Sequence, residues 1–76
     1  MPFINVKLLE GVFSEGQKRD IVSKMTDTMV DVAGEELRQA IWVVVEEVKE
    51  GYWGVGGEPV RSEDARRNNT KRRPGS

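Results

Sequence analysis

The sequence of 76 residues contains no cysteine and no histidine. Without cysteine there can be no disulfide and no thiolate metal site. Without histidine, the usual general base and the commonest zinc ligand are both missing. No apolar run reaches the roughly 18 residues of a membrane span, and no secretory signal pattern opens the chain. We therefore expect a cytoplasmic protein with no metal, no cofactor and no membrane partner.

The chain is long enough for one small domain only, and apolar residues make up 37 % of it. A domain of this size buries barely enough apolar surface to offset the conformational entropy that it loses on folding. Small domains usually gain further stability from disulfides, a metal or oligomerisation. Because the first two are excluded, we expect the chain to form a homo-oligomer.

Charge is distributed unevenly along the chain. Residues 1–60 carry 6 basic and 11 acidic side chains, whereas residues 61–76 carry 6 basic and 2 acidic ones. We interpret residues 1–60 as the folded domain and residues 61–76 as a basic C-terminal tail, either solvated or strapped across a neighbouring subunit. The tail has no aromatic residues to stack on bases, so nucleic acid is not an expected partner, and weak contact with phosphates stays a minor alternative.

The first half of the chain has the pattern of a strand followed by a helix. Residues 2–9 alternate with the two-residue period of a strand, and Pro2 stands at its start, where a missing N–H does least harm. Ser14 and Gln17 have the spacing of a capping box, and Gly34 is a typical helix stop. Between them, an apolar stripe at spacings of three and four predicts an amphipathic helix that buries Ile21, Val22, Met25, Met29, Val32 and Ala33.

The second half begins with a polar connection over residues 35–39, anchored by Leu37. Residues 40–47 are rich in β-branched side chains and predict a strand that is covered on both faces. Residues 51–57 hold four glycines around two large aromatics, which indicates a tight hairpin or loop. No helix follows closely enough for this segment to be a phosphate-binding loop.

The order strand, helix, strand predicts the fold class, α/β (α+β), with a β-α-β unit and a C-terminal hairpin. A helical crossover most naturally joins parallel strands. Two strands alone leave both edges open and one face bare. We therefore expect an oligomer in which the sheet is shared between subunits.

Pro2 is the first candidate for chemistry. A small second residue normally permits removal of the initiator Met, and the mature chain would then begin with the secondary amine of proline. Desolvation or a nearby cation lowers the pKa of such an amine. A neutral amine near pH 7 can act as a general base or as a nucleophile. By itself, proline at position 2 is common and carries no function.

Four elements together resemble the 4-oxalocrotonate tautomerase family. They are Pro2 after the initiator Met, Leu9-Glu10-Gly11 at the end of the first strand, Gln17-Lys18 in the first helical turn, and residues 51–57 after the second strand. The resemblance covers residues 2–58. It implies a β-α-β fold assembled into a homohexamer through dimers with a four-stranded sheet.

The resemblance also implies a site. Pro2 takes the place of the amine that shuttles a proton between an enol and its ketone, and Trp53 that of the aromatic that walls the pocket. Two arginines usual in the family are replaced, one by Val12 and one by Trp42. With Pro2, Val12, Trp42 and Trp53 contributed by neighbouring subunits, the pocket should be more apolar. Arg38 or Arg61 could supply a cation instead, and the sequence does not decide between them.

Two hypotheses from different classes follow. The first is a tautomerase-like isomerase that uses Pro2 as general base or acid on a small enol or ketone, an aromatic or mono-acid one being favoured over a dicarboxylate. The second is an oligomeric small-molecule-binding protein of the same fold that has lost efficient catalysis. Pro2 and the hairpin favour the first, and the missing arginines favour the second. Turnover of an enol with a free and with a blocked N-terminus distinguishes them.

Overall fold

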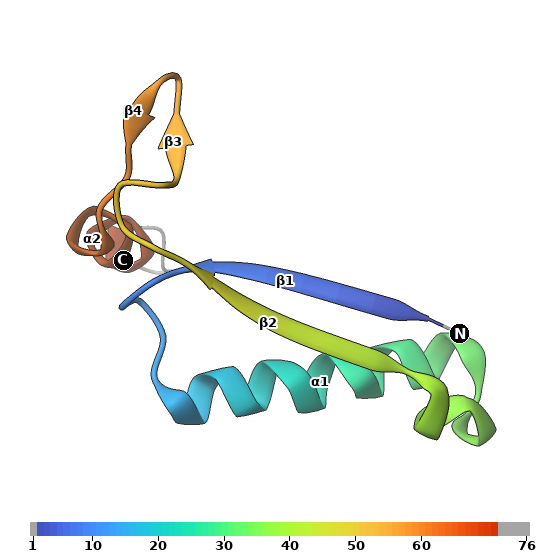
Figure 1. Ribbon diagram of the computed structural model, residues 1–76. Helices are drawn as coiled ribbons and strands as arrows, with labels where there is room; N and C mark the ends of the chain where they lie inside the picture. Colours follow the sequence, from blue (N-terminus) through green and yellow to red (C-terminus); the bar gives the residue numbers. More distant parts are fainter. Residues whose placement is uncertain (1, 72–76) are drawn as a thin grey trace. The chain divides into compact units, whose positions relative to one another are not determined.

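The computed structural model describes residues 2–71 (Figure 1). Within them, residues 2–7 and 14–46 form one compact unit, and residues 8–13 and 47–71 form a second. The elements in chain order are β1 (Phe3–Leu9), α1 (Glu15–Ala33), η1 (Glu35–Ala40), β2 (Trp42–Val48), β3 (Gly54–Val55), β4 (Glu58–Pro59) and α2 (Ser62–Lys71).

Helix α1 begins and ends where the sequence predicts. The Ser14 hydroxyl accepts from the backbone N–H of Gln17 at 3.1 Å, and the Gln17 side chain accepts from the backbone N–H of Ser14 at 2.9 Å. These two bonds complete the capping box and satisfy donors that the first helical turn leaves without partners. At the other end, Gly34 has a φ of 105° and donates its N–H to the carbonyl of Val30 at 2.8 Å. Glycine adopts this left-handed backbone without strain.

The buried stripe of α1 differs from the predicted one at its C-terminal end. Val32 was expected on the apolar face, but it is 82 % exposed, and Val30 is buried instead. A turn of 100° per residue places these two side chains about 160° apart around the helix. Val22 and Met25, at the margin of the stripe, are each 38 % exposed. The prediction for Val32 was therefore wrong, because spacing by three and four alone does not locate the centre of the buried face.

Strands β1 and β2 form a two-stranded sheet and run in the same direction, as expected for a β-α-β unit (Figure 1). At one end the backbone N–H of Trp42 donates to the carbonyl of Pro2 at 3.0 Å. At the other end the backbone N–H of Glu10 donates to the carbonyl of Val48 at 2.8 Å. In a parallel ladder the bond to Pro2 places Phe3 directly beside Trp42. The predicted strand pair is confirmed.

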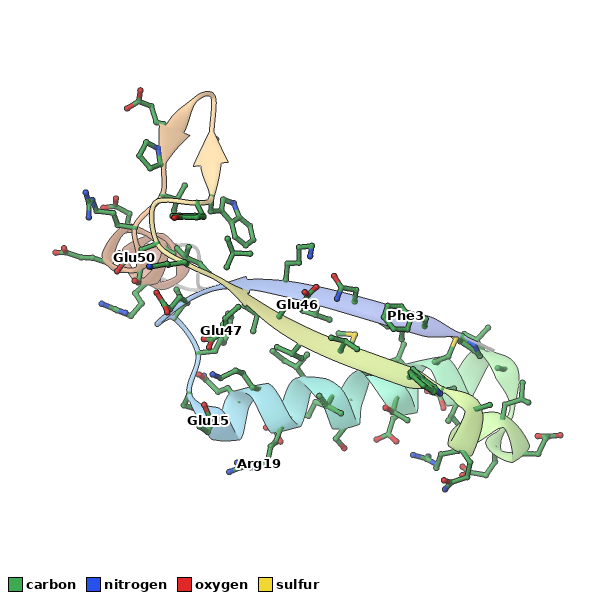
Figure 2. The ribbon with its side chains drawn as sticks, viewed as in Figure 1. Phe3, Glu15, Arg19, Glu46, Glu47 and Glu50 are labelled. Atoms are coloured by element: carbon green, nitrogen blue, oxygen red, sulfur yellow. The ribbon has the colours of Figure 1, made fainter. Side chains whose placement is uncertain are left out.

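In the first unit, the two faces of the sheet have different surroundings. Helix α1 lies along one face of the strands, and Glu46 lies on the opposite face (Figures 1 and 2). Glu46 accepts from the Asn5 amide at 2.7 Å and from the Lys7 ammonium at 2.9 Å. Both contacts help to hold the pKa of Glu46 below its ordinary value. The same face exposes Phe3 and Trp42, by 60 % and 56 %.

The second unit contains the predicted hairpin. Strands β3 and β4 pair antiparallel, with Gly54 opposite Pro59 and Val55 opposite Glu58. Gly56 and Gly57 connect them with φ values of 60° and 86°, which is the geometry that a two-residue hairpin turn requires. The hairpin is confirmed, although its strands lie toward the end of the predicted segment and beyond it.

Helix α2 lies where the sequence predicted a basic tail with no element of its own. Ser62 begins this helix and is 7 % exposed, and its backbone N–H donates to the Glu50 carboxylate at 2.9 Å. Glu63 and Asp64 stand in the first turn, where acidic side chains stabilise a helix. The composition of residues 61–76 does not reveal where α2 begins, because the carboxylate that caps the helix belongs to residue 50 and not to the residues next to Ser62. Residues 72–76, with Arg72 and Arg73 of the predicted basic cluster, lie outside the described residues.

None of the helices within residues 2–71 is both long and apolar enough to cross a membrane.

Candidate functional site

Pro2 stands immediately before β1, as the sequence predicts. Its carbonyl is the acceptor for Trp42, so the backbone at Pro2 is attached to the first residue of β2. Pro2 as a whole is half-buried. A proline nitrogen at this position would be held against the sheet at one end of the strand pair and would be partly shielded from water.

Trp42 lies at the same end of the strand pair as Pro2, but its side chain lies on the opposite face of the sheet. Side chains alternate along a strand, and Glu46, four residues later, meets Asn5 and Lys7 on the outer face. Trp42 therefore lies on the outer face beside Phe3, whereas Pro2 has the parity of the opposite face. Within one chain the indole is not positioned to line a pocket around Pro2. A role for Trp42 in such a pocket requires a second copy of the chain.

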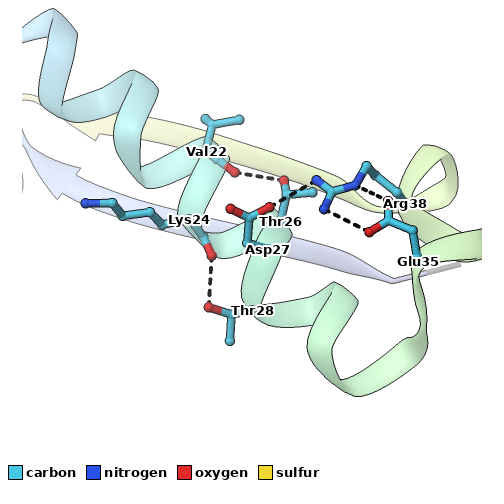
Figure 3. A network of polar contacts seen from close by, with 7 residues as sticks. All are labelled: Val22, Lys24, Thr26, Asp27, Thr28, Glu35 and Arg38. Carbon is cyan, nitrogen blue, oxygen red and sulfur yellow. Dashed lines mark hydrogen bonds and ion pairs between the residues drawn. The ribbon is translucent and has the colours of Figure 1, made fainter.

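Arg38, one of the two cations considered for the pocket, is held in a local network (Figure 3). Its Nε donates to Glu35 at 2.6 Å and its Nη2 to the same carboxylate at 3.3 Å, while its Nη1 donates to Asp27 at 3.0 Å. These bonds raise the pKa of Arg38 and help to lower that of Glu35. The guanidinium is thus already engaged by two carboxylates, and its structural role is to join η1 to α1.

The other three predicted site residues belong to the second unit. Val12 is half-buried and donates its N–H to the carbonyl of Leu9 at 3.4 Å, closing the turn after β1. Trp53 is half-buried, and its carbonyl accepts from the backbone N–H of Val60 at 2.7 Å, which closes the base of the hairpin. Arg61 is exposed and precedes α2, where its carbonyl accepts from Ala65 at 3.1 Å.

Helix α2 is attached to the turn that carries Val12, an attachment that no pattern in the sequence predicts. Arg66 donates from Nη1 to the carbonyl of Gly11 at 2.5 Å. Gly11 has a φ of +83°, and a Cβ at this position would lie 3.2 Å from Oγ of Ser62. Glu50, labelled in Figure 2, fixes the start of the helix through Ser62, and this contact lowers the pKa of Glu50.

Comparison with known proteins decides the family. The family model described as "Tautomerase enzyme" matches residues 2–63. The chain belongs to the tautomerase family. A probable tautomerase of Staphylococcus aureus strain Mu50 is 48 % identical over 64 residues, which cover 84 % of this chain and 98 % of that protein. This confirms the resemblance that the sequence motifs carry.

Solved structures show the same fold. The crystal structure of DmpI from Helicobacter pylori superposes with a TM-score of 0.67 at 36 % identity, covering 78 % of this chain and 95 % of that one. TomN, described as a 4-oxalocrotonate tautomerase homologue in the tomaymycin biosynthetic pathway, gives a TM-score of 0.70 at 31 % identity, covering 90 % and 95 %. The β-α-β arrangement of this tautomerase is therefore that of 4-oxalocrotonate tautomerase homologues.

Proposed function

We propose that this tautomerase interconverts an enol and its ketone with the Pro2 amine as the proton carrier. The observation that carries the proposal is the position of Pro2 in a chain of this family: it lies at the start of β1, half-buried and attached to β2 through its carbonyl. When Met1 is removed, the Pro2 nitrogen is a secondary amine. Partial burial disfavours its charged form and so lowers its pKa toward neutrality.

The reaction needs no group beyond this amine. The neutral amine takes the proton of the enol hydroxyl as the carbonyl bond forms, and the resulting ammonium delivers a proton to the carbon that becomes sp³. In the reverse direction the amine removes the proton from that carbon, and the oxygen is protonated. Protons balance in both directions and no oxidant or reductant takes part. A base whose pKa lies near the working pH performs both steps best.

The side chains expected around Pro2 favour a substrate with little charge. Val12, Trp42 and Trp53 present apolar surface, and Arg38 is occupied by Asp27 and Glu35. A dicarboxylate would have to leave water without guanidinium partners of the kind that pair with it bidentately. We propose an enolisable carbonyl compound that is aromatic or carries a single acid group.

We further propose that the working form is a homo-oligomer, and specifically a hexamer. Phe3 and Trp42 are adjacent and more than half exposed on the sheet face that α1 leaves uncovered, and Val44 has the same parity. Burying two aromatics is a large gain for a small domain. A monodisperse monomer in sedimentation at micromolar concentration would contradict this.

The experiment measures the rate at which an aryl enol is converted to its ketone in a spectrophotometric assay. Pro2→Ala replaces the rigid secondary amine with a primary one, and we expect it to reduce kcat/KM by about tenfold or more, within the range for a general base. Pro59→Ala, in β4, is the matched control and should retain the wild-type rate. Equal rates for wild type and Pro2→Ala would mean that the rigid secondary amine of Pro2 is not required.

The second candidate function is a small-molecule-binding protein of the same fold. The presence of Val12 and Trp42 at the two family arginine positions favours it. In that case the oligomer binds an aryl carbonyl compound at equilibrium, but neither the wild type nor Pro2→Ala changes the rate of enol conversion.

A further inference from the structure

The sheet face that α1 leaves uncovered carries a polar cluster beside its two aromatic side chains. The cluster consists of Asn5, Lys7 and Glu46, and it lies in the first unit together with Phe3 and Trp42. Burial alternates along β1, so that Phe3, Asn5 and Lys7 are exposed and the residues between them are half-buried. The side chains of Lys7 and Glu46 are more than half exposed. A single folded chain therefore leaves the cluster in contact with water.

The bonds inside the cluster leave hydrogen-bonding groups unused. The Asn5 amide at 2.7 Å and the Lys7 ammonium at 2.9 Å donate to the same atom, Oε1 of Glu46. Within residues 2–71, no hydrogen bond reaches the other oxygen of this carboxylate, Oε2. An ammonium has three N–H donors, and the bond to Glu46 uses one of those of Lys7. The face thus offers an anionic acceptor and a cationic donor side by side.

These unused groups fit a second copy of the same chain. One positive and one negative charge stand on this face, so its net charge is zero; its side chains are those of Phe3, Asn5, Lys7, Trp42, Val44 and Glu46. A strongly acidic or basic partner would meet one like charge for each opposite one. A second copy presents the same donor beside the same acceptor. Lys7 of each copy can therefore bond to Oε2 of Glu46 in the next, in a two-fold pair or in a closed ring.

Burial of the face would change the energetic importance of the cluster. An exposed ion pair contributes little to stability. When a second copy covers Phe3 and Trp42, the cluster beside them loses its water, and a charge without its partner becomes costly. An arrangement that places apolar side chains over Oε2 of Glu46 leaves this oxygen unsatisfied. The cluster therefore restricts how the second copy can lie.

We propose that the outer face of the sheet is a contact surface between copies of this chain, in which Lys7 of one copy bonds to Oε2 of Glu46 in the next. This rests on the proposed homo-oligomer and identifies the residues that determine how its subunits align. Phe3 and Trp42 supply the apolar burial, and the contacts between Lys7 and Glu46 exclude other alignments.

The test measures the sedimentation of four forms of the full chain over a range of concentrations: wild type, Lys7→Met, Glu46→Gln and the double variant. Each single variant leaves one charge at the interface without its partner, so the concentration of half-assembly should rise by about tenfold or more. The double variant leaves no charge there and should recover most of that loss. Asp20→Asn and Lys24→Met break an exposed ion pair of α1 and are the controls, which should assemble as the wild type does.

Three outcomes overturn the proposal, once circular dichroism has shown that each variant is folded. If the wild type assembles and both single variants assemble equally well, the contact between Lys7 and Glu46 does not exist. The same conclusion holds if the double variant is weakened by the sum of the two single losses. A monomeric wild type would refute the homo-oligomer itself, and this contact surface with it.

A second measurement does not depend on these variants. Trp53→Phe leaves Trp42 as the only tryptophan of the chain, and indole emission moves to shorter wavelength when burial removes water from the ring. Dilution from the assembled to the dissociated form should therefore shift the emission of Trp42 to longer wavelength. Dissociation without such a shift would show that the outer face lies outside the interface, even though the chain is a homo-oligomer.

Discussion

The two helices of this tautomerase are held in place in different ways. Helix α1 is capped by its own neighbours, Ser14 and Gln17, and Arg38 joins it to η1 through Asp27 and Glu35. Helix α2 takes its cap from Glu50 and its second attachment from Gly11. The capping and side-chain hydrogen bonds named here for α1 join residues at most 11 apart in sequence, whereas those named for α2 join residues 12 and 55 apart.

The arginines at these two attachments contact different groups. Arg38 completes a local structure and meets two carboxylates, so its charge serves the fold. Arg66 is brought to the turn at Gly11 by a helix that is itself anchored from a distance, and it meets a carbonyl there. Long-range attachment is thus the means by which the second unit positions a cation next to Val12.

The largest effect on stability is expected at Gly11. Gly11→Ala forces a left-handed backbone on a residue with a Cβ and presses that atom against Ser62, which should cost about 2–3 kcal/mol in urea unfolding. Gly51→Ala is the matched control, because Gly51 has a φ of +87° but nothing within 4 Å of the added atom. It should cost only about 1–2 kcal/mol. Equal losses, measured at one protein concentration, would mean that α2 is not packed on the turn.

A smaller effect is expected at the cap of α1. Ser14→Ala removes the acceptor for the N–H of Gln17 and should lower the free energy of unfolding by about 1 kcal/mol. Ser23→Ala, in the exposed interior of the same helix, should change it little or raise it slightly, because alanine favours the helix. If both variants lose the same amount, the capping box does not stabilise α1.

The cap of α2 should depend on pH. Contact with Ser62 lowers the pKa of Glu50 in the folded state, so this carboxylate stabilises the folded form fully above its unfolded value of about 4.3. The stabilisation is lost as pH falls through the lower, folded value. The protection of the Ser62 amide, measured as its exchange rate relative to the intrinsic rate at each pH, should therefore decrease below about pH 4 in the wild type. In Glu50→Gln the protection should already be lower at pH 7, and a protection that does not change with pH in the wild type would contradict the cap.

The smallest effect is expected at Arg38. Arg38→Gln removes exposed ion pairs, which contribute little to stability. We expect a small decrease in Tm and an unchanged kcat/KM for an aryl enol acid, because this guanidinium is engaged by Asp27 and Glu35. A large loss of kcat/KM for the acid would contradict the purely structural role of Arg38.

The sequence is sufficient to predict most of the fold. The capping box, the glycine stop and the alternation in residues 2–9 are local patterns, and local patterns fix α1, β1 and the parallel strand order. The position of the buried face was predicted less well, since Val32 and Val30 differ only in their direction around the helix. That direction depends on where the sheet lies.

The contacts around the candidate site residues could be predicted only in part, again because some depend on distant parts of the chain. Pro2 and Trp53 could be named because the family motifs include them. Glu50, Ser62 and Arg66 could not, because each acts through a contact with a distant residue and none belongs to a motif. The basic composition of residues 61–76 predicted a tail, while the actual cap of α2 lies on residue 50.

The most direct test of the account is the rate of enol conversion by two forms of the same protein. One has Met1 removed, verified by N-terminal mass spectrometry, and the other carries a peptide extension that keeps the Pro2 nitrogen in an amide. An amide nitrogen has no basic lone pair, so we expect conversion of the aryl enol acid at the uncatalysed rate in the extended form and catalysis in the processed one. Equal catalysis by both, with both forms folded and equally assembled, would show that Pro2 is not the base.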